Sequence, residues 1–348
     1  MPRVSFALAE TLRAVLERYS ITPGAIRDIA SGRMNRHWRI AAAGGREYVL
    51  RRYNTRRSRD SIAWEHALLA HAATRGLPVA EPLSARDRGR DRATLVEDGG
   101  SLYALFPLLP GHPSPYANLR YLRIKGRLLA RLHHELATWH PPGQRDGYGR
   151  IWELDTLFDH TPHVSFNEAL RAFGRDHRET ASGVRAQRYR SLRELSRLGY
   201  GDLPDAPVHW DFHHDNLFFV RGELTALLDF DSAHLDARAA DIAFSIALDC
   251  LEPPDHHAID PRAVRAFVGG YLEHTPLDNR ELRLIVPLVR AVIVWSGALA
   301  LSHQEHFGER VARSLDRSVR FRYPALEARA PALEAAVHAA AEEAAARS

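Results

Sequence analysis

Cysteine and lysine are almost absent from this sequence. Cys250 is the only cysteine, which excludes an intramolecular disulfide and a metal cluster built on cysteines. Lys125 is the only lysine, so arginine supplies nearly all of the positive charge. The first residues lack the basic start and apolar core of a signal peptide. We expect a cytoplasmic protein.

Charge and hydrophobic runs argue against two further classes. The net charge of +4 is small, and no run of basic residues is interleaved with aromatic ones, so we predict no nucleic-acid partner. The most apolar long run, residues 284–302, contains Arg290 and Pro287, and we predict a buried helix rather than a membrane span. With 348 residues, 45% hydrophobic and 26% charged, the chain has the composition of a soluble enzyme with two lobes.

Residues 208–243 carry the clearest chemical pattern. Two short apolar runs, 217–220 and 224–228, flank Arg221-Gly222-Glu223 and predict a β-hairpin. Asp211 and Asn216 precede its first strand, and Asp229 ends its second. The hairpin is therefore expected to bring three oxygen-bearing side chains into one small volume.

These side chains suit phosphoryl transfer. Carboxylates this close repel one another unless they share a proton or bind a cation, and Asn216 with Asp229 is a pair that Mg²⁺ prefers. Asp211 stands apart from that pair and is free to orient an attacking hydroxyl and accept its proton.

The combined pattern resembles the aminoglycoside phosphotransferase and choline kinase superfamily. The resemblance is carried by His209-x-Asp211-x4-Asn216, Leu228-Asp229-Phe230 and Asp241-Ile242-Ala243, and Asp215-Asn216-Leu217-Phe218-Phe219 is most similar to type II homoserine kinases. It implies a two-lobed, protein-kinase-like α+β fold, Asp211 as catalytic base, Asn216 and Asp229 as Mg²⁺ ligands, and Asp241 as a buried brace. Trp210 departs from the family pattern, in which a small residue is typical; its ring is expected to reshape the loop or to line the acceptor site.

The N-terminal part is predicted to form the nucleotide-binding lobe, residues 1–108. A helix is expected over 6–19, strands over 25–30, 37–42 and 47–53, and a second helix over 61–75. In the resembled superfamily the turn after the first strand covers the nucleotide, so Ser31 and Asn35 are candidate nucleotide ligands. Arg51 stands where relatives often present a lysine to the α and β phosphates, and Glu65 is its expected partner.

The end of this lobe is predicted to be a hairpin and a hinge. Residues 86–92 are expected to form a loop, and 93–96 and 101–108 the two strands. The segment 106–111 looks like the hinge, where adenine would stack and bond the backbone near Phe106 and Leu108.

Residues 109–348 are predicted to form a mostly helical lobe. Helices are expected over 119–136, 167–198 (one or two), 267–273, 279–303, 309–319 and 325–348. We interpret His133 as structural, and Asp236 as the cap of a helix beginning near Arg238. Trp152, Glu153 and Asp155 are candidates for the acceptor pocket.

We therefore predict a kinase that uses ATP and Mg²⁺ and transfers the γ-phosphate to a hydroxyl of a small molecule. Homoserine or another amino alcohol, an aminoglycoside, an amino sugar and other natural products are the candidate acceptors. Arg51 and Trp210 keep open a pseudokinase that binds nucleotide without transfer, and a protein serine/threonine kinase of the same superfamily is a third reading. The sequence does not predict the acceptor, the choice between ATP and GTP, or the oligomeric state.

Overall fold

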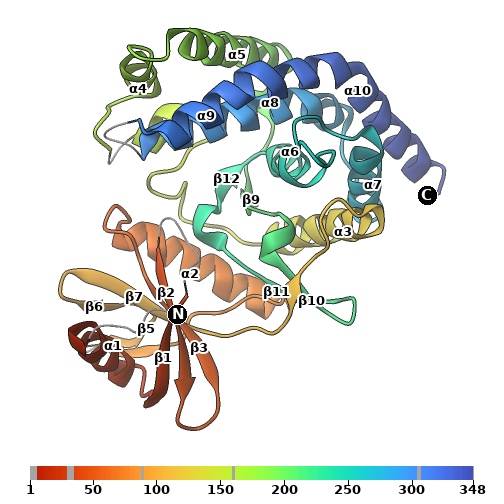
Figure 1. The fold of residues 1–348 in the computed structure, drawn as a ribbon. Helices are drawn as coiled ribbons and strands as arrows, with labels where there is room; N and C mark the ends of the chain where they lie inside the picture. Colours follow the sequence, from red (N-terminus) through yellow and green to blue (C-terminus); the bar gives the residue numbers. More distant parts are fainter. Residues whose placement is uncertain (1–5, 30–34, 88–89, 159–160, 304–306, 348) are drawn as a thin grey trace. The chain divides into compact units, whose positions relative to one another are not determined.

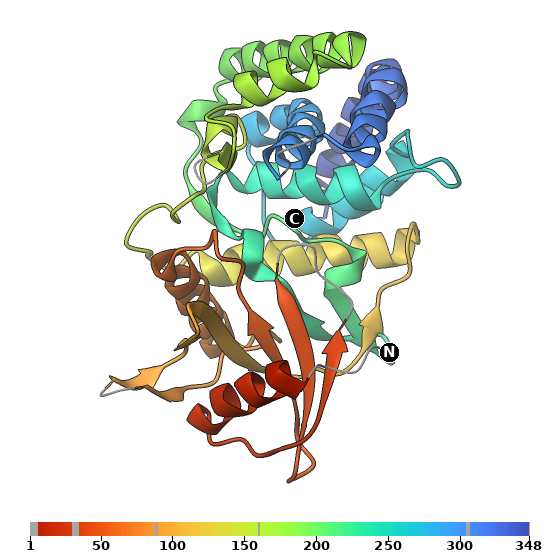
Figure 2. The ribbon, with the colours of Figure 1, turned by 60° about the vertical axis from the view of Figure 1, so that its left-hand side comes forward.

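The chain divides into two compact units. The computed structural model describes residues 6–29, 35–87, 90–158, 161–303 and 307–347. The first unit consists of Met1–His112 and Leu217–Leu228, and the second of Pro113–Asn216 and Asp229–Ser348. A hairpin from the middle of the sequence thus belongs with the N-terminal unit. Figures 1 and 2 show the ribbon in two views.

The first unit is built on a five-stranded antiparallel sheet. Its order is β1-β2-β3-β7-β6, with β1 (Pro23–Ile29), β2 (Arg36–Ala42), β3 (Glu47–Arg52), β6 (Val96–Asp98) and β7 (Ser101–Pro107). Alternate residues such as Trp38, Leu50 and Leu105 form a core with Leu12 and Leu16 of α1 (Phe6–Arg18), which covers one face. The other face meets α2 (Arg59–Thr74), since Arg51 of β3 pairs with Glu65 of this helix.

Two predictions for this unit were wrong. Residues 86–92 do not form a plain loop, because β4 (Ala85–Asp87) pairs with β5 (Arg90–Ala93). The strand expected over 93–96 instead begins at Val96 and runs to Asp98, where Gly99 and Gly100 make the turn with φ values of 53° and 71°. Backbone ladders stabilise such short strands whatever their side chains, and the charged composition therefore gave no sign of them.

The predicted hairpin in the middle of the chain is confirmed. Strands β10 (Leu217–Val220) and β11 (Glu223–Leu227) are antiparallel, with Leu217 opposite Leu227. Arg221 and Gly222 form the turn, both with positive φ. Together with β8 (His112–Pro113) they make a small sheet in the order β11-β10-β8.

The second unit is mostly helical. It contains α3 (Leu119–Leu136), α4 (Phe166–Phe173), α5 (Arg178–Arg197), α6 (Arg238–Asp249), α7 (Pro261–Leu272), α8 (Asn279–Ser302), α9 (Glu309–Arg317) and α10 (Tyr323–Ala345). A π-helical turn, Ser318–Arg322, joins the last two, and β9 (Ala206–Val208) pairs with β12 (His234–Asp236). Helix α3 lies beside α7 (Figure 1), and so closely that a Cβ on Gly126 would come within 2.0 Å of the Phe267 carbonyl oxygen.

Helix α8 is the central helix of this unit. It begins with a capping box in which Asp278 and Glu281 bond each other's backbone N–H groups. Its length and composition would suffice to cross a membrane, but 83% of its most apolar window is buried inside the protein. The prediction of a buried helix is therefore confirmed.

One capping prediction was wrong. Helix α6 has Ala237 at its N-cap, and no side chain caps it. Asp236 is fully buried instead, and its carboxylate accepts bonds from the Tyr200 hydroxyl and from the N–H of Ile151 (2.9 Å). Burial raises its pKa to about 7, although these hydrogen bonds act in the opposite direction.

Candidate active site

A loop between β9 and β10 carries Asp211, and α6 fixes this loop from both sides. The Asp241 carboxylate on α6 accepts the N–H of His209 at 2.8 Å and the N–H of Trp210 at 3.0 Å. One helical turn later, the Ser245 hydroxyl donates to the Phe212 carbonyl at 2.8 Å. The backbone is thus held immediately before and after Asp211.

Asp241 remains ionised in its buried position. Burial alone would raise its pKa, but the hydrogen bond and charge of His133 (Nε2 to Oδ2, 3.1 Å) bring it below its ordinary value. His133 is fixed in turn by the Tyr271 hydroxyl at 2.8 Å. The predicted brace and the structural role of His133 are both confirmed.

Trp210 packs into the core next to this loop. Its side chain is 1% exposed and touches the rings of His234, Phe244 and Trp295 at centroid distances of 5.1 to 5.4 Å. Its φ of 60° lies in the left-handed region that favours glycine, which explains why a small residue is typical here. The buried ring cannot line an open acceptor site, so that part of the prediction was wrong.

Asp211 and Asn216 are brought together as predicted, but Asp211 does not stand apart from Asn216, which bonds it directly. The Asn216 Nδ2 donates to the backbone carbonyl and to Oδ2 of Asp211, both at 2.9 Å. His213 Nε2 lies 3.3 Å from the other carboxylate oxygen, Oδ1. Burial lowers the pKa of His213, but the hydrogen bond and charge of Asp211 outweigh it and the net direction is upward. The Asp211 carboxylate is 30% exposed and can meet a substrate.

Asp229 lies at the same end of the hairpin as Asn216. Since Leu217 pairs with Leu227, Asn216 precedes that pair on one strand and Asp229 follows it by two residues on the other. Asp229 is exposed and has a left-handed φ of 62°.

A buried arginine holds the turn that follows Asp229. Arg145 Nη1 donates to the carbonyls of Phe230, Asp231 and Ala233 at 3.2, 3.0 and 2.9 Å. The Tyr148 hydroxyl also donates to the backbone carbonyl of Asp231, at 2.6 Å. No sequence pattern indicates this role, because Arg145 stands in a polar loop and looks like a solvated residue.

A buried ion pair next to the loop between β9 and β10 was also not predicted from the sequence. Lys125 Nζ lies 2.9 Å from Asp249 Oδ2, and both side chains are at most 1% exposed. The other oxygen, Oδ1, accepts the backbone N–H of His214 at 3.2 Å and bonds its Nδ1 at 2.8 Å. The available signal was that Lys125 is the only lysine in the chain.

In the first unit, Arg51 and Glu65 form the expected ion pair. Arg51 Nη1 is 2.9 Å from Glu65 Oε1, with side-chain exposures of 13% and 1%, and its Nε is 3.1 Å from His37 Nε2. Asn35 is buried, and its Oδ1 accepts the N–H of Asn54 at 3.0 Å. Ser31 lies outside the described residues.

The predicted hinge residues are partly engaged within the sheet. Phe106 is 6% exposed, and the Arg51 guanidinium lies 5.1 Å from its ring centroid. The Leu108 N–H donates to the Glu47 carbonyl at 3.1 Å, so it is not available to an adenine ring. Nucleotide binding at Phe106 and Leu108 stays a prediction.

The candidates for the acceptor pocket each make a structural contact. Trp152 packs edge-on against Tyr200 at 4.8 Å, Glu153 Oε2 accepts the N–H of Arg150 at 3.0 Å, and Asp155 Oδ1 accepts the N–H of Phe166 at 2.7 Å. Their role toward an acceptor stays a prediction.

Comparison with known proteins decides the family. The model of the phosphotransferase enzyme family matches residues 25–285. The chain belongs to this family. It is 30% identical to a homoserine kinase of Caulobacter vibrioides over 283 residues, which is 81% of this chain and 83% of that protein. A homoserine kinase of Granulibacter bethesdensis is 29% identical over 274 residues, 78% of this chain and 79% of the relative.

Solved structures agree on the fold. A microcompartment-associated aminopropanol kinase matches with a TM-score of 0.69 at 18% identity, covering 92% of this chain and 98% of that one. An amicoumacin kinase in complex with AMP-PNP and Ca²⁺ matches with a TM-score of 0.68 at 18% identity, covering 90% and 92%. The predicted kinase-like α+β fold is confirmed, and so is the prediction of an enzyme that phosphorylates a hydroxyl of a small molecule.

Proposed function

We propose that this enzyme transfers the γ-phosphate of ATP to the hydroxyl of homoserine or of a closely similar amino alcohol. The homoserine kinases to which it is 29% and 30% identical over about four fifths of its length support this choice. The aminopropanol kinase and the amicoumacin kinase, which resemble this chain in fold, support the wider class of amine-bearing alcohols as acceptors.

Asp211 is the catalytic base in this proposal, and the observation that carries it is the geometry of its loop. Asn216 fixes one carboxylate oxygen of Asp211, and Asp241 fixes the backbone before it. A carboxylate held this way can align an acceptor hydroxyl and accept its proton as the phosphorus–oxygen bond forms. The main contribution of such a base is to position the acceptor hydroxyl, because the transition state of phosphoryl transfer requires little covalent chemistry from the protein.

Asn216 and Asp229 are the residues that would hold Mg²⁺. Since Asn216 donates through Nδ2 to Asp211, its amide oxygen points away from that bond and is the atom offered to a cation. Asp229 adds an exposed carboxylate at the same end of the hairpin. Such an all-oxygen pair fits Mg²⁺, which when bound neutralises the charge on the phosphates and usually keeps water and phosphate oxygens as its other ligands.

Arg51 would bind the α and β phosphates, with Glu65 fixing its direction. The ion pair orients a planar guanidinium, and arginine binds phosphate oxygens in bidentate fashion where a lysine would bind as a point charge. Ser31, Asn35, Phe106 and Leu108 are proposed nucleotide ligands. We also propose that the enzyme works in the cytoplasm on a soluble acceptor.

The test is ATP consumption by the purified protein against a panel of acceptors. Homoserine, 1-amino-2-propanol, ethanolamine, choline, serine and an aminoglycoside are each supplied with Mg·ATP, and the product is identified by ³¹P NMR. We expect the highest kcat/KM with homoserine, and at least 10²-fold slower product formation by Asp211→Asn. A higher kcat/KM for another amine would replace homoserine as the acceptor. Firm ATP binding without turnover on any acceptor would instead support a nucleotide-binding module.

A further inference from the structure

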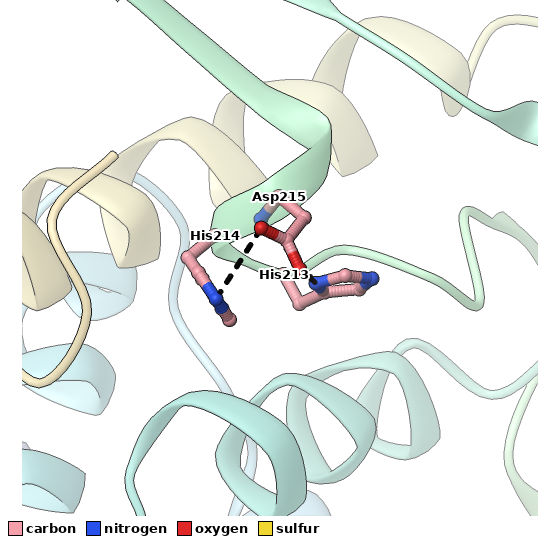
Figure 3. Close-up of side chains that lie close together, drawn as sticks. All are labelled: His213, His214 and Asp215. Carbon is pink, nitrogen blue, oxygen red and sulfur yellow. Dashed lines mark hydrogen bonds and ion pairs between the residues drawn. The ribbon is translucent and has the colours of Figure 1, made fainter. Parts of the chain in front are cut away.

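Two histidines and an aspartate converge on the loop between β9 and β10, shortly after Asp211. His213, His214 and Asp215 each offer one ligand atom, and these atoms all lie within 4.8 Å of one another. Asp215 Oδ2 is 3.9 Å from His213 Nδ1, and its Oδ1 is 3.5 Å from His214 Nε2. Figure 3 shows the carboxylate with a dashed line to each imidazole. All three side chains are reachable from solvent, with 18%, 26% and 63% of their surface exposed.

The second nitrogen of each ring is held by another carboxylate. His214 Nδ1 is 2.8 Å from Asp249, which is itself fixed by buried Lys125. His213 Nε2 is 3.3 Å from Asp211. Metal-binding histidines nearly always donate their other N–H to a carboxylate or carbonyl in this way, because the bond fixes the tautomer and turns the free lone pair toward the metal. The two rings are thus already oriented toward the space that Asp215 also faces.

We propose that His213, His214 and Asp215 form a binding site for a divalent metal ion, and that the preferred ion is Zn²⁺. Two imidazole nitrogens and one carboxylate are the donors that Zn²⁺ and Co²⁺ favour, whereas Mg²⁺ prefers oxygen ligands. The site is therefore distinct in chemistry from Asn216 and Asp229. Three protein ligands leave a fourth position for water or for an oxygen of a substrate.

Loading the site brings the three ligand atoms closer together. Ligand atoms on a tetrahedral Zn²⁺ are roughly 3.3 Å apart, given Zn–N distances of about 2.0 Å. The separations of 3.9 and 3.5 Å join the two imidazoles to different oxygens of Asp215, and the three ligand atoms lie within 4.8 Å of one another, so metal binding draws them closer together. A long 3.4 Å bond from the Asp215 N–H to His213 Nδ1 would be given up, as would the 3.3 Å approach of Asn216 Nδ2 to His213 Nε2.

Metal at this site acts on catalysis through Asp211, and this consequence rests on the proposed function. With its Nδ1 bound to metal, His213 must keep its proton on Nε2, where it donates to Asp211 Oδ1. That bond competes with the acceptor hydroxyl for the carboxylate. Zn²⁺ therefore inhibits phosphoryl transfer even when Mg²⁺ is in excess.

The experiment measures metal binding separately from turnover. The full chain is titrated with Zn²⁺ by calorimetry in excess Mg²⁺, and with Co²⁺ by visible absorption, which reports nitrogen ligation. The variant is Asp215→Asn, and the matched control is His140→Ala, which removes an exposed histidine outside the cluster. We expect one tight equivalent in the native protein and in the control, and at least a tenfold weaker binding in Asp215→Asn, whose thermal unfolding is checked in parallel.

Two outcomes overturn the proposal. Equal affinity of Asp215→Asn and the native protein would show that the metal binds elsewhere, for instance to scattered surface histidines. Loss of the tight equivalent in Asp229→Asn but not in Asp215→Asn would assign it to the Mg²⁺ ligands. Neither binding result depends on ATP turnover, so failure of the proposed function is recognised separately, by the acceptor panel.

Discussion

Replacing Trp210 sets two opposing effects against each other. The indole is buried and packs against Phe244, Trp295 and His234, so its removal leaves a large cavity. Truncation of a buried tryptophan costs about 3–5 kcal/mol of unfolding free energy. The left-handed backbone at φ 60° acts in the other direction, since a residue with a Cβ is less stable there than glycine by roughly 1–2 kcal/mol.

The packing loss is the larger effect, so both Trp210→Ala and Trp210→Gly should be less stable than the native protein. The two variants leave nearly the same cavity and differ only in the Cβ at a positive φ. We therefore expect Trp210→Gly to be about 1 kcal/mol more stable than Trp210→Ala, after the extra entropy that glycine gains in the unfolded chain. In most helices and strands the order is the reverse.

Urea unfolding followed by tryptophan fluorescence and circular dichroism measures both differences. If the glycine variant were the less stable of the two, the strain argument would fail. If either variant stayed within about 1 kcal/mol of the native protein, the packing argument would fail instead. A Trp210→Phe variant provides an intermediate point, because it keeps an aromatic ring in the cluster.

Three further predictions concern buried charges. Glu65→Gln should raise the KM for ATP about tenfold with a smaller effect on kcat, because Arg51 loses the partner that orients it. The control Glu47→Gln, in an exposed ion pair, should change neither constant. Equal KM values of Glu65→Gln and the native enzyme in steady-state kinetics would contradict this prediction. Arg145→Met should lower the unfolding free energy by roughly 2–4 kcal/mol and reduce kcat, since three buried carbonyls lose their hydrogen-bond donor. Arg262→Met, at an exposed position, should leave the unfolding free energy measured in urea unchanged. Because the pKa of Asp236 is raised to about 7, the folded state holds a proton that the unfolded state releases above about pH 4, and the unfolding free energy should fall between about pH 4 and 7 by up to about 1.4 kcal/mol per pH unit. Urea unfolding of Asp236→Asn at several pH values should lack this fall. Parallel pH profiles of the variant and the native protein would refute the prediction.

The features that the sequence predicted well are those that depend on local patterns. The hairpin around Arg221 and Gly222 was legible because apolar runs flank a turn, and the bounds of α3 and α8 because apolar residues recur at helical spacing. The Arg51–Glu65 pair was also foreseen, since the resemblance supplied two positions that only the fold brings together.

The features that the sequence missed depend on contacts between distant segments. Arg145 is 85 to 88 residues from the carbonyls that it bonds, and Lys125 is 124 residues from Asp249. No periodicity links such positions, and a lone charged residue in a loop or helix is normally solvated. The capping prediction for Asp236 failed for a related reason: Asp236 stands directly before the N-cap position of α6, and its carboxylate accepts bonds from Tyr200, Ile151 and the N–H of Ala237 rather than from the first turn of the helix.

The central claim is that Asp211 accepts the proton of the acceptor hydroxyl while Asn216 and Asp229 serve the metal and the nucleotide. The most direct measurement is a single-turnover assay of phosphoryl transfer to homoserine by Asp211→Asn, together with its Mg·ATP affinity by calorimetry. The amide keeps the size of the carboxylate but is a far weaker proton acceptor, so the rate of transfer should fall by at least 10²-fold while the affinity stays within about threefold. Transfer at the native rate, with Mg·ATP bound as tightly as before, would contradict the account.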